Sequence, residues 1–148
     1  MESRDFELID RAFCVLTECE SRHGSDSLDE TEQVVLRVWH ASGIIGNGGF
    51  RYFFECGLPL AATAEDYSRI GVERATKILR DLLELFPGRH VPDDLDERLQ
   101  LVDRLYQAHP SLLYRWERDY FETDDLMEKQ LAGWIRVHND VFQVSRLS

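Results

Sequence analysis

The residues best suited to chemistry in this chain are its carboxylates, which gather in three dense clusters. Closely spaced carboxylates create a negative field that attracts basic groups. Acids in the first turn of a helix are also stabilised by the helix dipole, so each cluster has a structural explanation beside a functional one. The candidate partner-binding acids are Glu18, Glu20, Asp26, Asp29, Glu30 and Glu32, then Asp93, Asp94, Asp96 and Glu97, and finally Glu117, Asp119, Glu122, Asp124, Asp125 and Glu128.

The histidines and cysteines form no recognisable catalytic or metal-binding pattern. The five histidines show no H-E-x-x-H spacing and the three cysteines no C-x-x-C spacing, and no G-x-S-x-G nucleophile motif occurs. We therefore expect no catalytic residue, no metal ligand and no cofactor. The cysteines, Cys14, Cys19 and Cys56, are expected to be buried free thiols in helices.

The segment from Gly43 to Gly57 combines five glycines with four aromatic residues. Its glycines could cradle a phosphate, but neither a P-loop nor a G-x-G-x-x-G spacing is present. The aromatic half repeats at i, i+3 and i+4, which predicts the buried face of a helix. We interpret the segment as a tight turn opening a short central helix that Gly57 closes, and its structural motif is Asn47, Gly48, Gly49, Phe50, Phe53 and Phe54.

Apolar residues elsewhere recur with the period of an α-helix, and no stretch alternates as a strand would. Ser27 and Glu30 have the spacing of a capping box, which predicts that the second helix starts there. The sequence predicts an all-α fold, a single domain over residues 1–148 with about seven helices packed around the short central one. The other helices are expected over residues 3–21, 28–42, 63–86 with a bend at Gly71, 94–108, 111–120 and 124–142.

Length and composition exclude several classes of protein. A chain of 148 residues with 43% hydrophobic residues can bury a core, and no apolar run reaches the ~20 residues of a membrane span. Lys and Arg number 17 against 28 Asp and Glu, a net charge of −11, which argues against direct binding of nucleic acid. With no signal segment at its start, the chain is expected to be cytoplasmic.

Asn47-Gly48-Gly49-Phe50 and the aromatics after it resemble the signature of a family of small acidic all-helical bacterial domains, a former domain of unknown function. The named member of that family is a DNA-mimic protein directed at a transcription factor. The segment Tyr67–Phe86 is similar to the helices that follow in the family. Tyr52 and Cys56 stand where the family tends to have Gln and Asn. The resemblance implies an acidic protein that binds a basic DNA-binding protein in place of DNA.

Three functions follow from these observations. The first is a non-enzymatic acidic interaction protein whose acids from both ends of the chain converge on one surface, and which as a DNA mimic would bind a basic DNA-binding protein or transcription factor. The second is an immunity-type inhibitor of a basic toxin or nuclease. The third is a small hydrolase or ligand-binding helical domain, which a pocket with paired titratable groups beneath Tyr52 and Cys56 would favour. The oligomeric state is left open.

Overall fold

The structure is a computed structural model that describes residues 4–138, and within that range the chain forms seven α-helices, two short 3-10 helices and no strand. The all-helical prediction is therefore confirmed. The helices are α1 (Arg4–His23), η1 (Ser25–Ser27), α2 (Glu30–Glu55), α3 (Leu60–Arg69), α4 (Glu73–Glu84), η2 (Pro87–Arg89), α5 (Leu95–Ala108), α6 (Pro110–Phe121) and α7 (Asp124–Val137).

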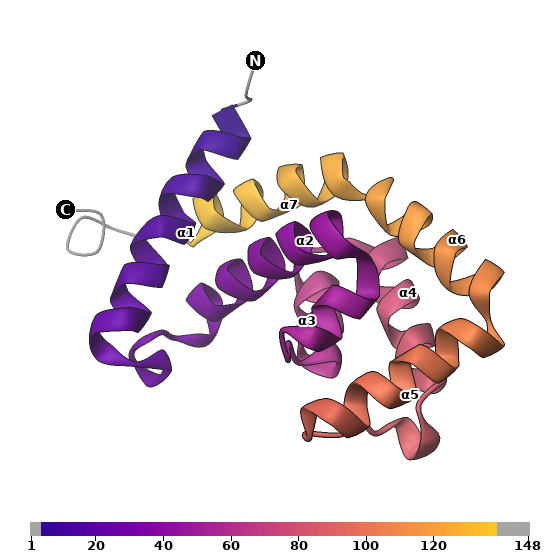
Figure 1. Ribbon diagram of the computed structural model, residues 1–148. Helices are drawn as coiled ribbons and strands as arrows, with labels where there is room; N and C mark the ends of the chain where they lie inside the picture. Colours follow the sequence, from indigo (N-terminus) through magenta and orange to yellow (C-terminus); the bar gives the residue numbers. More distant parts are fainter. Residues whose placement is uncertain (1–3, 139–148) are drawn as a thin grey trace.

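Helix α2 lies at the centre of the arrangement (Figure 1). Helices α6 and α7 run one after the other along one side of it, and α7 ends against α1. Helices α3 and α4 pack closely on each other, and α5 packs against both α2 and α6. None of the helices among residues 4–138 has the length and apolar character needed to cross a membrane.

The aromatic residues after the Gly-Gly step form the hub of the core. Phe50, Phe53 and Phe54 are all almost fully buried. Phe54 packs on Phe86 with ring centroids 5.2 Å apart, and Phe50 packs edge-on against Tyr120 at 6.3 Å. Burying a side chain of this size contributes roughly 1.5–3 kcal/mol. The hub therefore joins α2 to the segment just after α4 and to α6, and the buried face that the spacing predicted is confirmed.

The turn predicted before the aromatic helix is present as a kink at Gly49, which divides α2 into two parts. Helix α2 continues through Asn47 and Gly48, and only Gly49 leaves helical geometry. Asn47 thus caps no helix. The close of the helix was predicted correctly, because α2 ends at Glu55 and Gly57 follows with φ +73°.

Helix α2 begins two residues later than the sequence suggested. The capping box is formed by Asp29, whose side chain accepts from the N–H of Glu32 at 2.8 Å, and by Glu32, whose side chain accepts from the N–H of Asp29 at 3.0 Å. Ser27 instead belongs to η1 and donates to the carbonyl of Gly24. Ser27 and Asp29 are both suitable N-cap residues, and Asp29 caps α2 because its carboxylate is the stronger hydrogen-bond acceptor.

Other boundaries follow the predicted breaks. The helix predicted over residues 63–86 starts earlier, at Leu60, and divides where Gly71 adopts φ +83° between α3 and α4. The predicted extension of the last helix to residue 142 lies outside the described residues. The expectation of buried thiols was wrong for two cysteines, since Cys14 and Cys56 are exposed and only Cys19 is partly buried.

Candidate functional site

The kink in α2 is built on a glycine that no other residue could replace without strain. Gly49 has φ +68° and ψ −166°, a region open almost only to glycine. A Cβ atom added there would lie 1.8 Å from Oε2 of Glu117. The Gly-Gly-Phe step therefore serves to bend the helix and to admit a carboxylate from α6.

Glu117 connects three helices at this kink. The N–H of Phe50 donates to its Oε2 at 3.1 Å, and the hydroxyl of Tyr106 donates to its Oε1 at 3.1 Å. Burial raises the pKa of Glu117, and these two hydrogen bonds oppose the rise because they stabilise the carboxylate. Burial, followed by the nearby charge of Glu117, raises the pKa of Tyr106. Glu117 thus acts as the acceptor for the backbone N–H that the kink releases.

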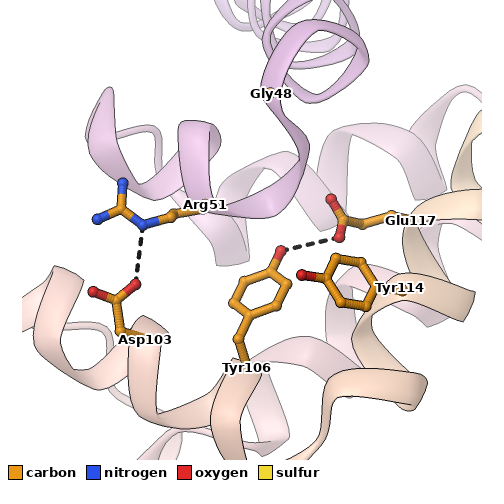
Figure 2. Close-up of a pocket in the computed structure, with 6 residues that line it drawn as sticks. All are labelled: Gly48, Arg51, Asp103, Tyr106, Tyr114 and Glu117. Carbon is orange, nitrogen blue, oxygen red and sulfur yellow. Dashed lines mark hydrogen bonds and ion pairs between the residues drawn. The ribbon is translucent and has the colours of Figure 1, made fainter.

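A cleft of about 370 Å³ opens beside the kink, between α2, α5 and α6. Figure 2 shows Arg51 turned toward Asp103 on one side and Glu117 on the other, with Tyr106 between them. The lining residues are Gly48, Arg51, Asp103, Tyr106, Tyr114 and Glu117.

The acids of residues 18–32 are largely engaged within the fold. Glu18 pairs with Arg22 at 2.6 Å and Glu30 with Arg69 at 2.7 Å. Glu32 is fully buried, so it is inaccessible to a partner, and Asp29 caps α2. The two that remain, without an ion pair in the described part of the chain, are Glu20 and Asp26.

The acids of residues 93–97 are exposed, and no ion pair involves them among residues 4–138. Asp94 caps α5 by accepting from the N–H of Glu97 at 3.0 Å. The neighbouring base, Arg98, points inward and donates to three backbone carbonyls, one at the end of α2 and two just before α5. Its charge therefore does not pair with the exposed carboxylates, which are Asp93, Asp94, Asp96 and Glu97.

The third cluster divides into neutralised and unpaired acids. Asp119 and Glu122 lie 3.4 and 3.0 Å from the guanidinium of Arg74, and Asp119 also lies 3.7 Å from that of Arg118. Three carboxylates in the first turns of α7 have no ion pair in the described range. We call Asp124, Asp125 and Glu128 the α7 acidic set.

Burial and mutual repulsion raise the pKa values of two acids of the α7 acidic set. The pKa of Asp124 is raised to about 6, first by burial and then by the charges of Glu128 and Asp125. Burial, with repulsion from Asp125 and from Asp5 at the start of α1, raises the pKa of Glu128. Asp5 therefore lies near Glu128, but its carboxylate is itself paired with the guanidinium of Arg136 at 2.7 Å.

The three acidic clusters nevertheless do not merge into one face. The turn between α1 and α2, the start of α5 and the junction of α6 with α7 lie at separate places in Figure 1. With a rise of 1.5 Å per residue, the 14 residues of α7 alone span about 21 Å. Convergence between the two ends of the described chain is therefore limited to the α7 acidic set and Asp5, which is paired with Arg136.

The pKa of Asp124 gives a first testable prediction. Because its folded value of about 6 exceeds the ordinary 3.8, the folded chain holds this proton more tightly than the unfolded chain. Its stabilising contribution is complete below about pH 4 and is lost as the pH rises through about 6. The carboxyl is about half exposed, so screening reduces the effect to about 1 kcal/mol.

The measurement is urea denaturation of the native chain and of Asp124→Asn at about pH 4 and about pH 7. Between about pH 4 and about pH 7, the free energy of unfolding of the native chain should fall by about 1 kcal/mol more than that of Asp124→Asn. Parallel pH dependence of the two proteins would show that Asp124 titrates normally.

The role of the residues that line the cleft with Glu117, among them Arg51, Tyr106 and Tyr114, was not predicted from the sequence. Nothing in the sequence links Glu117 to Phe50, 67 positions earlier, and the two tyrosines looked like ordinary helix residues. The available signal was the Gly-Gly step itself, since a break inside a helix leaves an N–H that needs an acceptor. The third hypothesis expected a pocket beneath Tyr52 and Cys56, whereas this cleft is lined by Arg51 and by α5 and α6.

These features define a class: an acidic all-helical domain whose long central helix is broken at a Gly-Gly-Phe step and held there by a carboxylate. The chain belongs to the DMP19-like protein family, whose model matches residues 26–138. The match includes the kink, the cleft and the α7 acidic set. No curated protein and no solved structure matches the chain.

Proposed function

We propose that this protein is a non-enzymatic DNA mimic that binds a basic DNA-binding protein in the cytoplasm. The observation that carries the proposal is the α7 acidic set. Three carboxylates crowd the first turns of one helix, with no ion pair among the described residues, and burial, followed by repulsion from neighbouring acids, raises the pKa values of Asp124 and Glu128. Like charges held together in this way lower the stability of the free protein, and a cationic partner would relieve their repulsion.

The spacing of the α7 acidic set suits a surface that normally contacts phosphates. Side chains at i and i+4 on a helix lie roughly 5–6 Å apart, which matches Asp124 and Glu128. Duplex DNA presents one charge per ~1.7 Å of its axis with both strands counted. Arginines and lysines arranged for such a ligand would find several carboxylates within reach. Membership of the DMP19-like family supports the same assignment.

The test is competition with DNA. The full chain, immobilised at low salt, should capture a basic protein from an extract of the native cells, and duplex DNA should release that protein in proportion to its concentration. A captured protein that binds the chain and DNA at the same time would contradict mimicry. A captured nuclease inhibited by the chain would support the immunity-type alternative instead.

A ligand-binding role has one specific observation in its favour, the cleft beside the kink. It contains titratable groups and two tyrosines, which are common features of small-molecule sites.

A further inference from the structure

The charges around the cleft leave one carboxylate without a cation. The guanidinium of Arg51 is held by Asp103 at 2.9 Å and by Glu55 at 3.2 Å, and the bond to Asp103 is the first cause of its raised pKa. Glu117, across the cleft, accepts hydrogen bonds from neutral donors, and no ion pair reaches it from the described residues. The cleft and its rim therefore carry a net negative charge.

Aromatic faces complete the lining. The rings of Tyr106 and Tyr114 lie with centroids 5.6 Å apart, at an angle of 52°. Tyr114 is 64% exposed, and its hydroxyl makes no hydrogen bond within the described part of the chain. The exposed ring of Tyr114 lies beside the partly buried carboxylate of Glu117, so a cation placed there could interact with the face of the ring and with the carboxylate.

These properties select the chemistry of a ligand. An anion would be repelled by Glu117 and Asp103, and an apolar group would leave both carboxylates desolvated. A guanidinium group is planar, stacks on aromatic rings and donates in a fork that matches a carboxylate. A cleft of about 370 Å³ has room for one such side chain or a small molecule.

We propose that the cleft between α2, α5 and α6 is a binding site for a guanidinium group, supplied by an arginine side chain of the basic partner. The ring of Tyr114 would stack on the guanidinium, and Glu117 would accept its hydrogen bonds. That the arginine belongs to a basic partner rests on the proposed function. Binding of a guanidinium group to the cleft can be tested without the partner.

The experiment titrates the full chain with N-acetyl-arginine N-methylamide while the ring signals of Tyr106 and Tyr114 are followed by NMR. The expected result is saturable shifts of these signals. The matched citrulline derivative, which has the same length and a neutral urea group, should produce none. Free arginine tests whether the natural ligand is a protein side chain or a small molecule. A site for a protein side chain should bind free arginine no more tightly than N-acetyl-arginine N-methylamide. Tighter binding of free arginine would indicate a small-molecule ligand.

Two variants of α6 locate the site. Tyr114→Ala removes an exposed ring and should weaken binding of the arginine derivative by about fivefold or more. Phe121→Ala removes another exposed ring of the same helix, away from the cleft lining, and should leave the affinity unchanged.

Three results would overturn the proposal: no saturable shift, equal shifts with the citrulline derivative, or an affinity indifferent to Tyr114→Ala. Since the titration involves no partner protein, such a failure counts against this site alone. Failure of DNA competition counts against the proposed function.

Discussion

Gly49→Ala should lower the free energy of unfolding by about 4 kcal/mol, the largest effect on stability expected from any single methyl group in this chain. The backbone at Gly49, with φ +68° and ψ −166°, is strained for any residue with a Cβ. The added methyl would also lie 1.8 Å from Oε2 of Glu117, so the carboxylate would have to move. The buried N–H of Phe50 would then lose its acceptor. Urea denaturation monitored by circular dichroism measures the loss.

The control for this substitution is Gly46→Ala in the same helix. Gly46 is exposed and helical, and apart from its chain neighbours and the nearby backbone of its own helix, no atom lies within 4 Å of the position of its Cβ. Alanine there should raise stability, by up to about 1 kcal/mol, because it lowers the entropy of the unfolded chain. Equal stabilities of the two variants would contradict the assignment of the kink as the device that positions Glu117.

Neutralising the α7 acidic set should have the largest effect on partner binding. The triple variant Asp124→Asn, Asp125→Asn and Glu128→Gln removes three carboxylates that have no ion pair within residues 4–138. At roughly 1 kcal/mol for each charge at low salt, affinity for the captured partner should fall about 100-fold. Isothermal titration calorimetry with the purified partner measures the change.

A matched triple variant separates the site from the total charge. Glu18→Gln, Asp81→Asn and Glu84→Gln remove three carboxylates that already pair with Arg22, Lys77 and Arg89. Either variant reduces the acids from 28 to 25 against 17 bases, so the net charge changes from −11 to 17 − 25 = −8. The matched variant should bind the partner nearly as tightly as the native chain does. Equal losses in both would mean that only overall charge matters.

The helices could be predicted because their signals are local. Apolar periodicity identified the buried stripes, and the glycines at positions 57 and 71 end helices with positive φ as expected. The position of the kink was predicted less well. Asn47 and two glycines are individually poor helix residues, but Asn47 and Gly48 stay helical and the break is confined to Gly49, with Ile45 buried before it and Phe50 buried after it.

The roles of the acids could not be predicted, because they depend on contacts between distant segments. Glu30 meets Arg69 from α3, Glu122 meets Arg74 from α4, and Glu117 meets the backbone of α2. In sequence these three carboxylates resemble Asp125, which has no such partner among the described residues. The composition shows how many acids the chain has. Only the folded structure shows which of them make internal contacts and which are available for binding.

The most direct test of the central claim is the affinity of the captured partner for the native chain and for the triple variant of the α7 acidic set, measured over a range of salt concentrations. If this set replaces phosphates, the logarithm of the native association constant falls linearly with the logarithm of the salt concentration, and the slope is shallower in the variant. An affinity that does not change with salt, and is the same for both proteins, would contradict the account.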